Sequence, residues 1–218
     1  MTIYGKLISL FPISQFLLIC WALIAFVLGP SLVGGFLVIA AIYLLPLAAF
    51  HLHQAFFPLK AGVTDITSGY NVWYGTHMIQ SLLIAMPLFE RVLRLIPGAF
   101  AFWLRLWGSK VGNNVHWTSH FEVADRSLLD IGDYVVFGYN VRIASHIVTP
   151  NSKYGMVVFV KRVCLGSQSF IGAEVGLGPG AIVEEGALVP TNTIVLPRRT
   201  VKKEQPEKSR EGHTEAAS

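Results

Sequence analysis

The stretch VKRVCLGSQSFIGAEVGLGPGAIVEEGALV, residues 160–189, decides the fold of this chain. Every sixth position within it and just beyond it is apolar, and a small or β-branched residue stands two positions before each. These apolar positions are Leu165, Ile171, Leu177, Val183, Val189 and Val195, and a glycine directly follows the first three. The period of six fits neither an α-helix, with about 3.6 residues per turn, nor an ordinary strand, whose side chains alternate.

A hexad pattern predicts a parallel β-helix, in which each hexad supplies a short strand, a tight corner and one inward apolar side chain. Glycine suits the corner because it relieves backbone strain. The pattern also occurs upstream, at Val111-Gly112, Ile131-Gly132, Phe137-Gly138 and Ile143-Ala144. Since three hexads make one coil, we expect a mainly β domain over residues 109–197 with about four to five stacked coils. A β-sandwich of short strands is the alternative.

The hexad register breaks between Ile143 and Leu165. This separation exceeds the length of one coil, three hexads, by about four residues, which we expect to be looped out. The predicted loop covers roughly residues 147–160 and begins directly after His146.

The N-terminal region contains no lysine, arginine, aspartate or glutamate between Lys6 and Lys60. Gly29 and Pro30 divide it into two apolar segments of about 20 residues, and each is about 30 Å long as a helix. We therefore predict a transmembrane helical hairpin over residues 1–59, with two inserted but non-spanning helices as the alternative. Because the neighbouring cations lie outside the spans, the positive-inside rule places both termini and the downstream domain in the cytoplasm.

Residues 60–108 stay apolar and aromatic, with recurring spacings of three to four that predict helices. We expect interfacial helices that lie on the membrane and cap the first coil, or helices simply packed on the downstream domain. The side chains expected in the lipid headgroup region are Phe100, Phe102, Trp103, Trp107, Arg105 and Lys110. The polar tail, residues 198–218, is predicted to be disordered.

Composition excludes several classes of protein. The chain is 53% hydrophobic and 14% charged, which excludes an ordinary soluble monomer and a disordered regulator. The net charge of +4 is scattered, whereas a nucleic-acid binder gathers its cations on one face. Cys20 and Cys164 are the only cysteines, so no disulfide framework is available.

Four stretches resemble the hexapeptide-repeat acyltransferases, a family that includes galactoside O-acetyltransferases and UDP-N-acetylglucosamine acyltransferases. They are LRLWGSKVG (104–112), VADRSLLDIGDYVVFG (123–138), NVRIASHIVTP (140–150) and residues 160–189. The likeness is greatest to the membrane-attached branch, including the acyltransferase-like terminal part of poly-lysine synthetases. The resemblance implies a left-handed β-helix, a homotrimer, and acetyl-CoA or another acyl-CoA as co-substrate, with no metal.

In this family a histidine just before an extruded loop is the general base, and His146 occupies that position. Imidazole takes a proton near neutral pH, as attack of a hydroxyl or amine on a thioester requires. By motif match, Ser167 supplies a backbone N–H to the oxyanion. The resemblance assigns to CoA the turn residues and cations Gly166, Ser167, Gly172, Ala173, Gly178, Arg198 and Arg199, with Lys161 and Arg162 as other candidates for the phosphates. Acceptor binding is assigned to Asn140, Asn151, Asp125 and His120.

We therefore predict a membrane-anchored acyltransferase on the cytoplasmic side of a bacterial-type inner (plasma) membrane. Its acceptor is expected to be a hydroxyl or amine of a membrane-associated saccharide or a lipid-linked molecule, because attachment raises the effective concentration of partners on one surface. The alternative is a non-catalytic trimeric scaffold for a polysaccharide- or lipid-modifying complex. A zinc lyase of the γ-carbonic anhydrase kind is disfavoured, since Asn151 stands where a second histidine ligand is needed.

Overall fold

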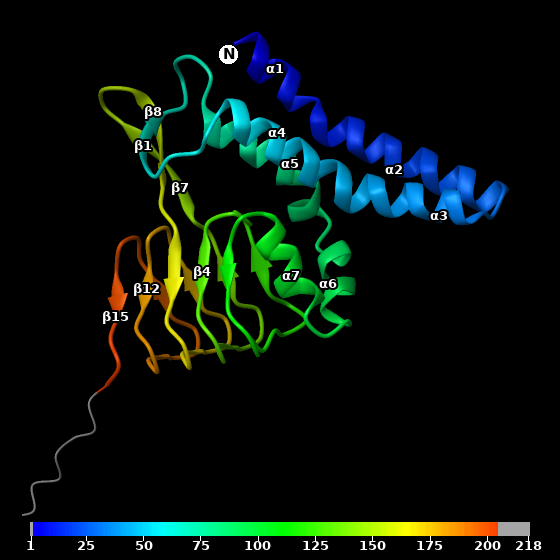
Figure 1. The fold of residues 1–218 in the computed structure, drawn as a ribbon. Coiled ribbons are helices and arrows are strands. Elements are labelled where there is room, and N and C mark those ends of the chain that lie inside the picture. The colour runs from blue at the N-terminus through cyan, green and yellow to red at the C-terminus, as the bar shows by residue number, and fades with distance from the viewer. Residues whose placement is uncertain (1, 205–218) are drawn as a thin grey trace, which may run out of the picture.

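The computed structural model describes residues 2–204, in which a layer of helices lies along one side of a stack of β coils (Figure 1). The helices are α1 (Ile3–Ser9), α2 (Phe11–Leu28), α3 (Leu32–Ile39), the π-helix η1 (Ala40–Leu44), α4 (Leu45–Phe56), α5 (Val72–Ala85), α6 (Leu88–Arg94) and α7 (Ala99–Leu106). The strands are β1 (Gly62–Asp65), β2 (Lys110–Val111), β3 (Glu122–Val123), β4 (Leu129–Ile131), β5 (Val136–Phe137), β6 (Arg142–Ile143), β7 (His146–Asn151), β8 (Gly155–Val160), β9 (Val163–Leu165), β10 (Phe170–Ile171), β11 (Gly176–Leu177), β12 (Ile182–Val183), β13 (Leu188–Val189), β14 (Ile194–Val195) and β15 (Thr200–Val201).

Three parallel sheets form the faces of the β-helix: β15-β12-β9-β4-β2, β13-β10-β5 and β14-β11-β6-β3. Ile182 pairs with Cys164 on one side and Thr200 on the other, and each step is 18 residues, or three hexads. All six apolar hexad positions from Leu165 to Val195 are buried. The structure thus confirms the predicted stack of parallel coils, whose apolar core sits inside the prism.

The inserted segment after His146 is an ordered β-hairpin, where a loop was expected. Leu129 pairs across the insertion with Val163, 34 residues later, which exceeds the usual step of 18 by 16 residues. The expectation of four extra residues was wrong because Ile143 and Leu165 lie on neighbouring faces of the prism, one hexad apart. The hairpin consists of β7 and β8, and β1 adds to it as a third antiparallel strand.

The glycines that open the corners meet a steric need and do not relieve backbone strain, as we had expected. Positive φ angles occur at the third corner residue instead, as at Tyr134 (57°) and Gln168 (60°). A Cβ added to Gly132 would lie 2.5 Å from the backbone nitrogen of Ser167 on the next coil. Glycine is required there because coils stacked at the spacing of hydrogen-bonded strands leave no room for a side chain.

Helix α7 caps the first coil, as predicted, but three of its expected headgroup residues are buried. Phe100, Trp103 and Trp107 are 2%, 4% and 0% exposed because they cover the open end of the apolar core. Arg105 does not reach outward, since it donates hydrogen bonds to the carbonyls of Val111 and Gly112, both at 2.8 Å. Phe102 keeps the expected exposure, at 59%.

The N-terminal helices form the predicted helical hairpin. Two continuous helical stretches, Ile3–Leu28 and Leu32–Phe56, have mean hydropathies of 2.3 and 2.4 and are long and apolar enough to cross a membrane by length and composition. The π-helix η1 interrupts the second, and Gln15 of the first donates a hydrogen bond to the Ala41 carbonyl (3.1 Å). Near the base of the hairpin, Ile19 and Ile42 pack on Leu82 of α5.

The β-helix continues beyond the expected boundary at residue 197. Thr200 and Val201 form β15 and pair with β12, inside the segment predicted to be a disordered tail. The rest of that tail, from residue 205, lies outside the described residues.

Candidate functional site

His146 and Asp125 meet at one corner of the prism. His146 begins β7, and Asp125 follows β3 at the corresponding corner of the preceding coil. The Nδ1–H of His146 donates to Asp125 Oδ2 at 2.7 Å, and the same oxygen accepts the Ser145 backbone N–H at 2.8 Å. Asp125 is only 2% exposed. This geometry fixes the imidazole ring through Nδ1 and leaves Nε2 for proton transfer, the arrangement of a general base oriented by a third group.

Helix α5 covers the ring of His146. The ring centroid of Trp73 lies 4.5 Å from that of His146, and His77 lies 5.5 Å away in an edge-to-face arrangement. Trp73 and His77 also stack on each other. Burial lowers the pKa of His77, and the nearby His146 and Arg126 lower it further against the opposing effect of Asp125. His77 is therefore a neutral neighbour of His146 at pH 7.

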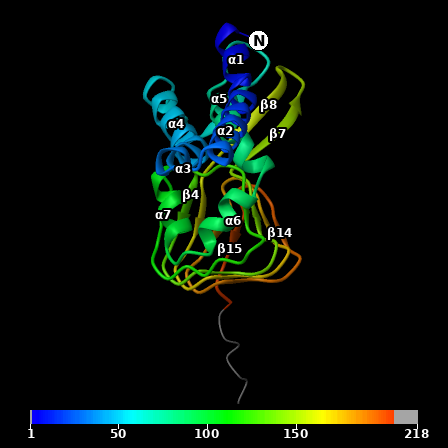
Figure 2. The same cartoon turned by 90° about the vertical axis from the view of Figure 1, so that its right-hand side faces the viewer.

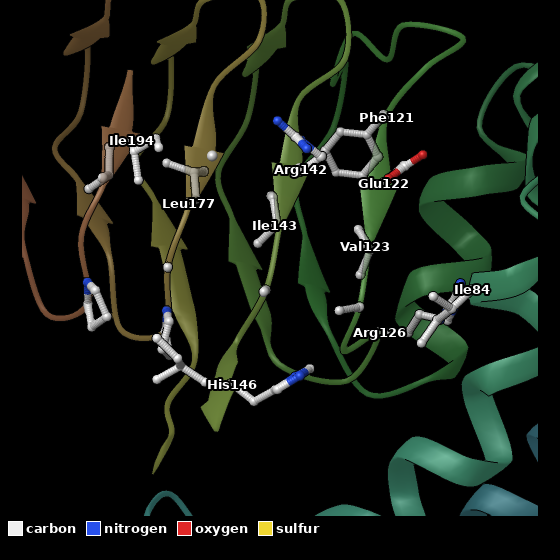
Figure 3. A pocket seen from close by; sticks show the side chains of 18 of the residues that line it. Ile84, Phe121, Glu122, Val123, Arg126, Arg142, Ile143, His146, Leu177 and Ile194 are labelled. Carbon is white, nitrogen blue, oxygen red and sulfur yellow. The ribbon is translucent and has the colours of Figure 1, made fainter. Parts of the chain in front are cut away.

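An apolar groove of about 580 Å³ runs along the β14-β11-β6-β3 face and has His146 at its border (Figure 3). Its walls come from the strands and corners of this face, with Leu83, Ile84 and Pro87 contributed by the helical layer. The main polar side chains of its lining are His146, Arg126, Arg142, Glu90 and Glu122. A groove with mostly apolar walls and a few convergent polar groups is the usual form of a small-molecule site.

A buried ion pair holds the helical layer against the corner that carries Asp125. Arg126 donates from Nε and a terminal nitrogen to the two carboxylate oxygens of Glu90, at 2.6 and 2.9 Å. Trp103 Nε1 donates to Glu90 at 2.8 Å, and Gln80 of α5 accepts the Arg126 backbone N–H at 2.9 Å. Because Arg126 directly follows Asp125, this network ties α5, α6 and α7 to the site.

The residues expected to bind CoA lie at three different corners of one chain. Gly178, Arg198 and Arg199 follow the strands β11 and β14, so they share the corner of His146. Gly166 and Ser167 follow β9 at a second corner, whereas Gly172 and Ala173 follow β10 at the third. Within one chain these turns therefore do not line one groove, and Ser167 is absent from the walls that surround His146.

The four residues expected to bind the acceptor have other partners. Asp125 is buried behind His146, where it orients the ring and is out of reach of an acceptor. Asn140 donates to Glu174 at 2.6 Å, and Asn151 accepts two backbone N–H groups in the turn of the β7–β8 hairpin. His120 contacts Ser119 and Tyr139 at the second residue before β3. Of the four, the structure brings only Asp125 to His146.

Sequence reasoning missed the contributions of Trp73 and His77. Their spacing of four places both on one face of α5, and this signal is readable from the sequence. Nothing in the sequence places that face against His146, because the contact depends on how the helical layer docks on the β coils. Among residues 2–204, no group of three or more His, Cys, Asp or Glu side chains is arranged to hold a metal ion.

Comparison with known proteins finds similarity only at the level of solved structures. No protein-family profile matches the chain, and no curated protein matches it. A hexapeptide-repeat-containing acetyltransferase from Vibrio cholerae is 13% identical with a TM-score of 0.39, covering 56% of this chain and 86% of that one. Its acetyl-CoA complex gives 14%, 0.40, 56% and 82%. A maltose O-acetyltransferase from Clostridium difficile 630 gives 19%, 0.28, 57% and 89%. Similarity this low carries no argument about the activity of this chain.

Proposed function

We propose that this chain transfers an acyl group, most simply acetyl, from acyl-CoA to a hydroxyl or amine acceptor, with His146 as the general base. The observation that carries this proposal is the hydrogen bond between His146 Nδ1 and the buried carboxylate of Asp125, at the border of an apolar groove. A histidine held in this way is suited to take a proton through Nε2.

The reaction follows from this geometry. His146 Nε2 takes the proton of the acceptor O–H or N–H while the acceptor attacks the thioester carbonyl. The Asp125 carboxylate stabilises the imidazolium that forms. When the tetrahedral intermediate collapses, the C–S bond breaks and the imidazolium returns its proton to the leaving thiolate. The apolar walls of the groove suit the alkyl arm of an acyl-CoA, and Arg142 at the groove supplies a cation for a phosphate.

A homotrimer of left-handed β-helices completes this site in the proposal. Ser167 lies at a different corner from His146, so its backbone N–H reaches the oxyanion only from a neighbouring chain. Large apolar side chains are exposed on the sheet faces, among them Leu188 (59%) and Ile194 (75%), and suit burial between subunits. Native mass spectrometry of the active protein should show three chains, and an active monomer would contradict the shared site.

Membrane attachment through the helical hairpin belongs to the same proposal. The outer surfaces of α2 and α3 expose large apolar side chains such as Trp21, Leu28 and Leu32, which suit a lipid environment. The protein would lie on the cytoplasmic side of the inner (plasma) membrane and act on a lipid-linked or membrane-associated saccharide. Parallel assays of the full chain with a lipid-linked acceptor and its soluble analogue test this choice. Equal turnover would favour a soluble acceptor.

The catalytic proposal is tested with full-length protein in detergent, because α5 and β1 are both part of the surroundings of His146. Release of free thiol from acetyl-CoA is followed with candidate saccharide and amine acceptors. His146→Ala should lower turnover about 100- to 10,000-fold, whereas His116→Ala, an exposed histidine outside the groove, should not. Wild-type protein that binds no acyl-CoA and releases no thiol would favour the non-catalytic scaffold instead.

A further inference from the structure

Helix α6 carries an apolar stripe that faces away from the protein. Leu88, Val92 and Leu95 are 62%, 46% and 81% exposed, and their spacings of four and three place them on one side of the helix. Ile96, directly after them, is 58% exposed. A contiguous apolar surface of this kind on a folded protein marks a contact site.

The stripe adjoins the helical hairpin. Phe89 of α6 packs with Ile19 and Ile42 near the base of the hairpin, and the Tyr43 hydroxyl donates to the Phe89 carbonyl at 2.8 Å. Figure 1 shows α6 at the end of the coil stack beyond which α2 and α3 extend, and Figure 2 shows α6 in front of that end. A membrane that receives the hairpin from this end therefore meets α6 as well.

Positive charge gathers beside the stripe. Arg91 and Arg94 lie on α6, while the nearest carboxylate, Glu90, is already bound through both oxygens by Arg126. Among the described residues, Arg91 Nε and two nitrogens of Arg94, Nε and Nη1, are buried without a hydrogen-bond partner. Burial lowers the pKa of Arg94, an effect that Glu90 opposes and Arg91 increases. An anion at this place would stabilise both guanidinium groups.

We propose that α6 is a docking site for anionic phospholipid, with its apolar stripe in the upper acyl region of one leaflet and Arg91 and Arg94 on the lipid phosphates. Exposed apolar side chains flanked by arginines are the pattern of a helix that lies in a membrane interface. The inference rests on the proposed membrane attachment and adds a second contact with a preference for headgroup charge. It also places the membrane surface beside Pro87 and Glu90, which line the groove.

Contact with lipid is tested with a fluorophore on Leu95→Cys in a variant that lacks Cys20 and Cys164. The full chain is reconstituted in vesicles of phosphatidylcholine and phosphatidylglycerol that contain lipid with a nitroxide near the headgroup end of the acyl chain. We expect strong quenching at Leu95→Cys. A matched label at exposed Ser152→Cys, on the turn of the β7–β8 hairpin, should be quenched less.

Headgroup preference is tested by native mass spectrometry of protein incubated with equal amounts of phosphatidylglycerol and phosphatidylcholine. R91Q/R94Q should lower the retention ratio about thirtyfold, since each arginine contributes about 1 kcal/mol near an anionic surface. K202Q/K203Q removes the same charge at the opposite end of the coil stack and should leave the ratio unchanged. R91Q alone keeps the bond from Arg94 to the Ser119 carbonyl and should give part of the effect.

Three outcomes would overturn the proposal. An unquenched Leu95 label on protein that still floats with vesicles would leave the hairpin as the membrane contact and remove α6. Displacement of phosphatidylglycerol by inorganic phosphate alone would identify a free-phosphate site. Cross-linking of Leu95→Cys between chains would show that a second copy covers the stripe. Protein that does not float with vesicles would instead contradict the proposed membrane attachment itself.

Discussion

The indole of Trp73 lies 4.5 Å from the imidazole of His146, so a helix that precedes the β-helix in the chain covers the proposed base. The same helix packs through Leu82 on Ile19 and Ile42 near the base of the apolar hairpin. Helix α5 is therefore the element that connects the helical layer to the site. This arrangement makes the neighbours of His146 the first targets for mutation.

Asp125→Asn should lower kcat about 100-fold or more while KM changes little. The amide keeps the shape of the side chain but neither stabilises the imidazolium nor holds the ring in the tautomer with a free Nε2. The measurement is steady-state thiol release with an acceptor identified as above. Asp130→Asn removes a carboxylate from a surface pair with Lys110 and serves as the matched control. Equal kinetics of the two variants would remove Asp125 from the mechanism.

His77→Lys should lower turnover at least about tenfold relative to His77→Gln. A permanent cation beside His146 opposes the positive charge that the imidazole acquires when it takes a proton. His77→Gln removes the ring without adding charge and reports the effect of lost packing alone. The groups that face His77 are His146, Asp125 and Arg126, and none of them changes in these variants. If both variants lose activity equally, His77 serves packing only.

The contribution of His77 to stability should depend on pH. Its pKa in the folded protein lies below the usual 6.5, so the unfolded chain binds the proton first as the pH falls. The associated stability is fully present above about pH 6.5 and is lost as the pH falls through the lowered pKa. Thermal unfolding in detergent between about pH 7.5 and 5 should therefore show a steeper decline for the wild type than for His77→Gln. Parallel curves would contradict this assignment.

Glu90→Gln should destabilise the protein by about 3–5 kcal/mol, because it leaves the buried Arg126 charge without its counter-ion. The side chains of Arg126 and Glu90 are 1% and 5% exposed, so water cannot take the place of the carboxylate. The double variant Glu90→Gln/Arg126→Gln should lose less than the two single variants together. Additive losses in melting temperature would show that the pair is not coupled.

The hexad period by itself determined the β-helix, its inward residues and the position of His146 before an insertion. It could do so because each apolar position is buried only against the matching position of the next coil, so the period in sequence is the period in space. The purpose of the glycines and the length of the insertion were misjudged. Both depend on which residues of neighbouring coils and faces stack together, and a linear pattern does not show this.

The surroundings of His146 were decided by tertiary structure. Asp125 was expected to bind the acceptor, yet its corner lies directly beside that of His146 on the next coil, where the carboxylate is buried and bonded to Nδ1. Trp73 and His77 reach the same ring only because α5 docks along the β coils, through contacts such as Gln80 to Arg126. Local periodicity fixes which face of an element is apolar, whereas the partner of that face is chosen by packing between segments far apart in the chain.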